Sequence, residues 1–281
     1  MKKAMAQHID ETDFLVVDVE TTGLSSDAGD RVCEVGAVRL RGGAVLDTFG
    51  SLVDPRRPIS AGAYAVNRIS PQMLTSAPQF SSIAEKLWEM MQHSVLVAYN
   101  APFDLSFIVN EFRLIGFPPI RNAVVDALAI ARKILPGLGK YPQENVAQVL
   151  GISFPVQHRA TGDAMVTAKI FTLFTSILKA YDLTSVSDLL RQDLLRDLSE
   201  KRLSILQQAL DAGGNLWLKY LSASNGEITD RVVTPKQLTL DASARSSATC
   251  LRAYCHAAKA ERSFRVDRIL DLRVVKNLTS V

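Results

Sequence analysis

Near its N-terminus the chain carries the stretch Phe14-Leu-Val-Val-Asp18-Val-Glu20-Thr-Thr-Gly23-Leu24. Its apolar, β-branched first half predicts a buried central strand. Because side chains two residues apart in a strand leave the same face, Asp18 and Glu20 point together. Two carboxylates in such a place repel each other, and they are costly to bury unless they are paired or bound to a cation. The stretch therefore indicates either a cation site or a solvated strand end.

Three polar side chains farther along the chain favour the cation site. Asp104 and Asp163 each fall near the start of an expected helix, where an acid is also common as a simple cap. His158 precedes Asp163 by five residues, a separation that would place them on different sides of a continuous helix. We therefore expect His158 on the preceding loop, leaning over Asp163.

The order of the expected elements predicts an α/β layer structure for residues 1–180, with a mixed sheet flanked by helices. Strands are expected over 14–20, 32–40, 44–53, 95–98 and 124–125, with a hairpin turn at 41–43. Helices are expected over 81–92, 104–114, 127–134, 143–150 and 163–178, and loops over 55–63 and 158–162.

The composition changes in the last third of the chain. Residues 181–204 are rich in Asp, Arg, Leu and Ser and are expected to form a helical linker. Residues 205–281 are expected to form a small β-rich domain, with strands over 216–221, 228–234, 237–241, 250–255 and 264–275.

Charge is unevenly distributed between the two parts. Residues 1–180 carry 17 Lys and Arg and 17 Asp and Glu, whereas residues 206–281 carry 11 against 7. This basic excess favours a polyanionic partner for the C-terminal domain, and a solvated charged surface is the alternative.

The composition also argues against a membrane or secreted protein. No apolar run approaches the ~20 residues of a membrane span, and no apolar segment typical of a signal peptide follows Lys2 and Lys3. Cys33, Cys250 and Cys255 are widely spread, as expected for free thiols in a reducing compartment. We expect a cytoplasmic protein.

Three motifs, taken in order, resemble those of the DEDDh group of DnaQ-like 3′–5′ exonucleases. They are Asp18-Val-Glu20-Thr-Thr-Gly, Asn100-Ala-Pro-Phe-Asp104 and His158-Arg-Ala-Thr-Gly-Asp163-Ala. The resemblance covers about residues 12–180 and includes supporting segments at 34–39, 52–55 and 126–132. It implies a ribonuclease H-like fold. One departure is Asn67-Arg68-Ile69, where the family often has His-Gly-Ile.

The resemblance implies a catalytic set of Asp18, Glu20, Asp104, His158 and Asp163. Asp18, Glu20 and Asp163 would hold one metal ion, Asp18 would bridge to a second, and Asp104 would act mostly through metal-bound water. Oxygen ligands suit Mg²⁺ or Mn²⁺, and two such ions suit phosphodiester hydrolysis. His158 would take the proton from the attacking water.

The family uses the turn after the first acids against the terminal nucleotide. Backbone amides there would meet the 3′-hydroxyl, and Leu24 would pack on the base. The residues assigned to nucleic-acid binding in this part of the chain are Thr22, Gly23, Leu24, Asn100 and Phe103. Phe103 is either a stacking residue or part of the core, and Asp126 is expected to cap a helix rather than to bind metal.

Residues 205–281 resemble a WYL domain, a small Sm-like β-barrel often found in bacterial regulators. The resemblance rests on segments 216–220, 231–235, 251–255 and 262–269. Thr249-Cys250-Leu251 stands in place of the Trp-Tyr-Leu run, so only the leucine is retained. The resemblance implies an arginine cluster for phosphate, single-stranded nucleic acid or a nucleotide ligand, made of Arg231, Arg252, Arg262, Arg265 and Arg268. The alternative is a set of surface salt bridges with Asp230, Glu261 and Asp267.

Together these resemblances predict a two-metal 3′–5′ exonuclease that releases nucleoside 5′-monophosphates, with single-stranded DNA favoured over RNA. One alternative is a WYL-type regulator with an accessory nuclease fold, although no helix-turn-helix is evident. Another is a proofreading subunit held by a polymerase, with Gln192-Asp-Leu-Leu195 as a sliding-clamp peptide.

Overall fold

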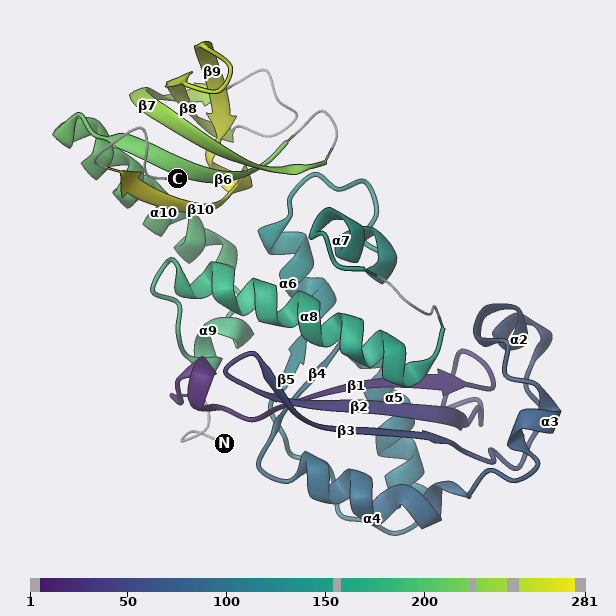
Figure 1. Ribbon diagram of the computed structural model, residues 1–281. Coiled ribbons are helices and arrows are strands. Elements are labelled where there is room, and N and C mark those ends of the chain that lie inside the picture. The colour runs from purple at the N-terminus through teal and green to yellow at the C-terminus, as the bar shows by residue number, and fades with distance from the viewer. Residues whose placement is uncertain (1–5, 154–157, 223–225, 242–247, 276–281) are drawn as a thin grey trace. The chain divides into compact units, whose positions relative to one another are not determined.

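The computed structural model describes residues 6–153, 158–222, 226–241 and 248–275. The chain divides into two compact units, each containing a five-stranded sheet (Figure 1). The first unit comprises Met1–Ala129, Val146–Thr172 and Ser185–Leu190, and the second comprises Ile130–Asn145, Leu173–Thr184 and Arg191–Val281. The division into domains at residues 180 and 205 stays a prediction.

The sheet of the first unit is mixed, as predicted, with the strand order β3-β2-β1-β4-β5. Strand β2 (Val32–Arg41) pairs antiparallel with β1 (Phe14–Thr21) on one side and with β3 (Ala44–Leu52) on the other. On the other side of β1 lie β4 (Val95–Ala98) and β5 (Val124–Asp126), both in parallel pairing. The central position of β1 explains why its first residues are apolar on both faces.

The two faces of β1 pack against different helices. Leu15, Val17 and Val19 belong to a core formed with α4 (Phe80–Met91) and α5 (Ala101–Leu114). Phe14 leaves the opposite face, where its ring meets Phe171 of α8 (Ala160–Lys179) edge-on at 4.8 Å between centroids. Figure 1 shows α8 and α4 on opposite sides of the sheet. Asp18 and Glu20 therefore share the face that α8 covers.

Several short helices complete the first unit and the segments that join it to the second. They are η1 (Ile9–Glu11), α2 (Ala61–Asn67), α3 (Pro71–Leu74), α6 (Ala127–Ile134), α7 (Gln143–Val149) and α9 (Val186–Leu190). The expected loop over 55–63 is wrong at its end, because Ser60 caps α2 by accepting a hydrogen bond from the amide of Ala63. Helix α8 likewise begins three residues earlier than expected, at Ala160.

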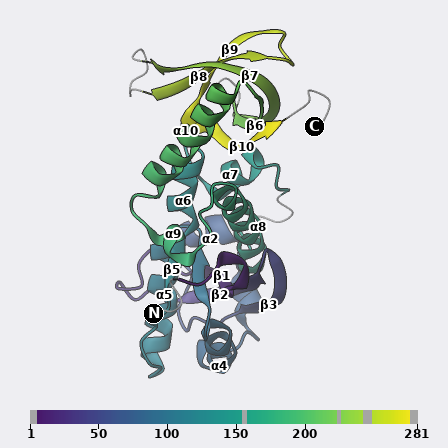
Figure 2. The ribbon, with the colours of Figure 1, turned by 90° about the vertical axis from the view of Figure 1, so that its left-hand side faces the viewer.

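The second unit contains α10 (Leu194–Ala212) and an antiparallel sheet with the order β10-β6-β7-β8-β9. Its strands are β6 (Asn215–Leu221), β7 (Ile228–Asp241), β8 (Ala248–Cys255), β9 (Ala260–Arg265) and β10 (Ile269–Val275). Figure 2 gives a second view of α10 beside this sheet, and α10 contacts β7 and β10.

Two strand predictions for the C-terminal part are wrong. Residues 228–234 and 237–241 form one strand, β7, because an irregularity between Pro235 and Gln237 shifts the register without ending the pairing with β8. Residues 264–275 do not form one strand, because the 3-10 turn η2 (Val266–Arg268) separates β9 from β10 and buries Val266.

None of the helices in the described ranges combines the length and the apolar character needed to cross a bilayer.

Candidate active site

The acidic site is built on the paired residues of β1 and β2. Asp18 on β1 pairs with Gly36 on β2, and Glu20 pairs with Glu34. Directly opposed residues of antiparallel strands project from the same face. Asp18, Glu20 and Glu34 thus place three carboxylates on the face covered by α8.

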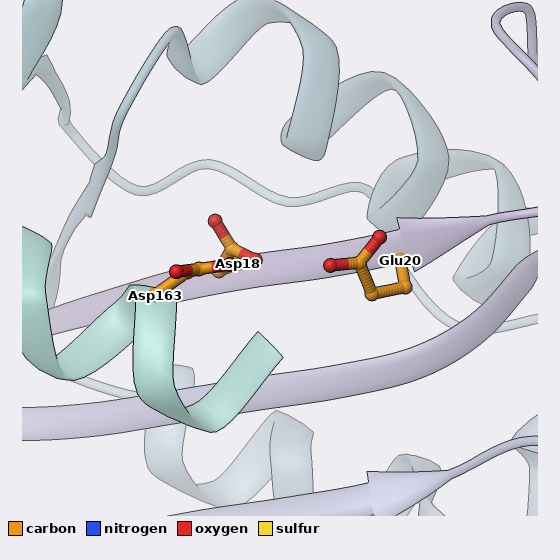
Figure 3. A group of neighbouring side chains, drawn as sticks. All are labelled: Asp18, Glu20 and Asp163. Atoms are coloured by element: carbon orange, nitrogen blue, oxygen red, sulfur yellow. The ribbon is translucent and has the colours of Figure 1, made fainter. Parts of the chain in front are cut away.

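The first turn of α8 adds the next acid. The amide of Asp163 donates to the carbonyl of Arg159 at 2.9 Å, which places Asp163 in that first turn. One carboxylate oxygen each from Asp18, Glu20 and Asp163 lies within 4.8 Å of the others (Figure 3). A strand end and a helix start, about 145 residues apart in sequence, are therefore brought to one point, as the motif order predicted.

Burial and mutual repulsion make this site unfavourable for negative charge. Burial raises the pKa of Glu20 to about 8, and Asp163 and Glu34 add to the rise. For Asp18 the pKa is raised well above its usual range, by burial first and then by Asp104 and Asp163. Burial also raises the pKa of Asp163, against the lowering effect of His158 and nearby backbone amides. A divalent cation would lower the cost of ionising these carboxyl groups, because its positive charge stabilises the carboxylates.

Asp104 lies next to this cluster but outside the set of closely spaced oxygens. It is buried in the first turn of α5, and its Oδ1 accepts a hydrogen bond from the amide of Val19 at 3.0 Å. Burial raises the pKa of Asp104 to about 7, and its charge in turn raises the pKa of Asp18. The backbone bond to β1 fixes Asp104 beside Asp18.

His158 stands on the turn that precedes α8, as expected. Its backbone has a φ of 57°, a left-handed conformation that is uncommon for a histidine, and its side chain is exposed. Its charge and its backbone amide lower the pKa of Asp163, so His158 lies close to that carboxylate. The imidazole is thus both near the acids and accessible to solvent.

The loop after β1 presents one exposed apolar side chain. Leu24 is 86% exposed, whereas Thr22 and Gly23 are buried. The hydroxyl of Thr22 donates to Asp30 at 3.2 Å, and its carbonyl accepts from the amide of Ser60 at 2.9 Å. Thr22 therefore holds the loop, and Leu24 is the residue of the three whose side chain faces solvent.

The motif around Asn100 and Phe103 also combines an exposed residue with a partly buried one. Asn100 is exposed and left-handed at the start of α5, where its amide donates to Asp126 at 3.2 Å. Asp126 also accepts from the amide of Leu128 at 3.0 Å, so it caps α6, as expected. Phe103 is half-buried against the core, with its ring 5.1 Å from that of Phe107. Phe103 therefore packs partly against the core and stays partly exposed.

The sequence motifs do not single out Glu34, although it lies in the site. Glu34 belongs to the segment 34–39 that supports the family resemblance, and its carboxylate accepts from Arg159 at 2.8 Å and from the amide of Ala160 at 3.2 Å. The signal available in the sequence was an acid inside an apolar strand, Val32-Cys-Glu34-Val35.

The C-terminal arginines are partly engaged with carboxylates. Arg265 forms a two-bond pair with Asp267, and Arg252 pairs with Glu261 at 3.3 Å. Both pairs belong to the salt-bridge alternative. Arg262 is exposed on β9, whereas Arg268 lies in η2 and packs against Gly137. The two therefore do not share a strand face.

Comparison with known families agrees with both resemblances. A family model described as Exonuclease matches residues 15–171, and a WYL domain model matches residues 201–274. Since the first covers more than half of the chain, the protein belongs to this DnaQ-like exonuclease family. Enzymes of the family are metal-dependent.

Curated relatives include a DNA polymerase III subunit epsilon and PolC-type DNA polymerases III. The epsilon subunit of Treponema pallidum is 36% identical over 171 residues, which are 60% of this chain and 78% of the relative. The PolC-type polymerase of Caldanaerobacter subterraneus is 33% identical over 195 residues, or 69% of this chain. The chain spans only 14% of the length of that PolC-type relative.

Solved structures share the fold. Escherichia coli Exonuclease I in complex with a dT13 oligonucleotide aligns with a TM-score of 0.54 and 18% identity, covering 86% of this chain and 55% of that one. A 3′-exonuclease that recognises the histone mRNA stem-loop aligns with a TM-score of 0.51 and 16% identity, covering 59% and 81%.

Proposed function

We propose that this chain is a metal-dependent 3′–5′ exonuclease that removes nucleoside 5′-monophosphates from single-stranded nucleic acid. The observation that carries the proposal is the meeting of Asp18, Glu20 and Asp163 within 4.8 Å, with His158 on the adjoining turn. Closely spaced carboxylate oxygens, whose ionisation burial and mutual repulsion disfavour, fit a hard divalent cation, Mg²⁺ or Mn²⁺.

Asp18, Glu20 and Asp163 would hold the cation, and Asp104 would serve a second one next to Asp18. When bound, such ions neutralise the scissile phosphate and help to ionise the attacking water. Asp104 is well placed for an indirect role, because one of its oxygens is already occupied by the amide of Val19.

His158 is the proposed general base. Its exposed imidazole stands on the turn before α8, close to Asp163 and accessible to water. Imidazole is the side chain best suited to accept a proton near neutral pH.

The terminal nucleotide would lie against the loop after β1. Leu24 offers an exposed apolar surface for its base, and the buried Thr22 and Gly23 keep the loop in place. Asn100 and Phe103 would line the opposite side. Contacts of this kind depend on base stacking and on the nucleic-acid backbone, and not on the base sequence. Single-stranded DNA is the preferred substrate in this proposal, supported by an Exonuclease I neighbour bound to an oligonucleotide and by polymerase III relatives.

The C-terminal domain would bind the nucleic acid farther from its 3′ end or sense a nucleotide. The match to a WYL domain and the basic excess of residues 206–281 support this role. The same match supports a second candidate function, a WYL-type regulator in which the nuclease fold is accessory. A polymerase partner is a further proposal, suggested by the relatives' names, and a clamp partner is suggested only by the segment Gln192-Asp-Leu-Leu195.

A gel assay separates these functions. A 5′-labelled single strand of DNA, and an RNA of the same sequence, would be incubated with Mg²⁺, with Mn²⁺ and with EDTA. A metal-dependent ladder that shortens from the 3′ end, and is lost in His158→Ala, is the expected result. Intact strands in every lane, with retained binding, would favour the regulator. The faster substrate would decide between DNA and RNA.

A further inference from the structure

The first turn of α8 packs closely against strands β2 and β3. Gly36 on β2 pairs with Asp18 on one side and with Gly50 on β3 on the other, so the three stand in one row across the sheet. A Cβ at Gly36 would overlap the backbone of Ala160, and a Cβ at Gly50 would overlap the hydroxyl of Thr161. The helix backbone therefore rests directly on the sheet beside Asp18.

Glu34 holds this turn in place from the next row. Because Glu34 pairs with Glu20, its side chain leaves the same face of the sheet. Nη2 of Arg159 donates to Oε1 at 2.8 Å, and the amide of Ala160 donates to Oε2 at 3.2 Å. Each carboxylate oxygen is thus bonded to one of the two residues that directly follow His158.

A direct metal-ligand role for Glu34 does not fit this geometry. Among the residues that the structure describes, the closely spaced ligand oxygens belong to Asp18, Glu20 and Asp163. The Glu34 carboxylate is instead turned toward α8, and its side chain is only 8% exposed. A third acid beside Glu20 increases the repulsion in the site, a cost that stability alone does not explain.

We propose that Glu34 is a positioning residue for the nuclease centre, acting through Arg159 and Ala160 on the start of α8. The inference rests on the proposed function, because Glu34 has this task only if His158 and Asp163 take part in hydrolysis. Its bonds fix the turn that carries the imidazole, and they fix the helix start one turn before Asp163.

The substitution Glu34→Gln tests the role with little change of volume. Glutamine can still accept from the amide of Ala160, but it lacks the charge that binds Arg159. We expect the Mn²⁺ affinity of the folded protein, measured by electron paramagnetic resonance, to fall roughly 10-fold, and kcat on a labelled oligonucleotide to fall about 10- to 100-fold. In metal-free protein, amide hydrogen exchange over residues 160–163 should become faster.

Two further variants sharpen the test. Arg159→Met should reproduce these effects, and the double variant should be no worse than the more impaired single variant if the two residues act through one bond. Arg39→Met is the matched control, since it removes an arginine on the same strand that pairs with Asp47 at 3.6 Å, outside the site. It should leave Mn²⁺ affinity and exchange at 160–163 unchanged.

Variants at Glu34 and Arg159 that are less stable, but that keep the wild-type Mn²⁺ affinity, kcat and exchange at 160–163, would overturn the positioning role. Failure of the proposed function has a different signature: the wild-type protein would neither bind Mn²⁺ at the acids nor shorten any strand. In that case exchange at 160–163 would still report whether Glu34 anchors α8.

Discussion

Raising the pH in the absence of metal should destabilise this protein through Glu20. Burial is the main reason that the pKa of Glu20 rises from 4.5 to about 8. Below pH 4.5 the carboxyl is protonated in both the folded and the unfolded chain, so the folded state carries no penalty. Between 4.5 and 8 the unfolded chain releases the proton while the folded chain retains it, and stability falls. Above about 8 the penalty is complete and constant.

The size of the effect follows from the shift. One pKa unit corresponds to about 1.4 kcal/mol, so Glu20 contributes an upper bound of roughly 5 kcal/mol across this interval. The steepest slope for one group is about 1.4 kcal/mol per pH unit. Asp104, whose pKa burial raises to about 7, acts in the same direction. A bound divalent cation favours the ionised carboxylates and should remove most of this loss.

Urea unfolding in EDTA, at pH values from about 5 to about 8, measures the prediction, and Glu20→Gln supplies the control. The free energy of unfolding should fall with pH in the wild-type protein and fall less steeply in the variant. Added Mg²⁺ or Mn²⁺ should raise stability most at the higher pH. A wild-type stability that stays level or increases over this range in EDTA, or an equal slope in Glu20→Gln, would refute the reasoning.

Three other perturbations have defined outcomes. Asp18→Ala should abolish Mg²⁺-dependent hydrolysis without lowering the melting temperature in EDTA, because it removes a repelled buried acid; retained activity would contradict the assignment. Arg68→Gly should raise the free energy of unfolding by about 1 kcal/mol, since Arg68 ends α2 with a φ of 56°, and an unchanged denaturation midpoint would argue against strain there. Arg231→Gln with Arg262→Gln should weaken the binding of long single strands and reduce the slope of log affinity against log salt by about 0.7 per lost phosphate contact. Anisotropy titrations at several salt concentrations measure that slope, and hydrolysis of short oligonucleotides should not change.

The spacing of Asp18 and Glu20 sets their shared direction, whereas the full set of acids was predicted from the resemblance of three ordered motifs to an exonuclease family. Asp18 and Glu20 share a strand face at any register, and an acid in the first turn of a helix points toward its N-terminal end. The mixed sheet followed from the order of the elements in the same way. These are local rules, and they depend little on how distant segments pack.

Features that depend on distant segments were missed. The bond between Glu34 and Arg159 joins residues 125 positions apart. It depends on the register of β1 on β2 and on where the first turn of α8 packs against the sheet. In the second unit, η2 interrupts the expected strand, so Arg268 and Arg262 are separated although their spacing in sequence is even. Helix α2 was missed because a single capping serine, Ser60, marks its start.

The electrostatics of the site explain why it indicates function rather than mere surface chemistry. The strand that ends in Asp18 and Glu20 is otherwise apolar, and aliphatic side chains at these two positions would relieve the repulsion that raises their pKa values. Arg159, the nearby arginine, bonds to Glu34 instead of to either of these acids. The folded chain therefore brings together carboxyl groups whose ionisation is disfavoured by burial and by one another, and the first turn of α8 contributes one of them. A bound divalent cation would favour the ionised carboxylates, which is the chemistry that the proposed nuclease centre requires.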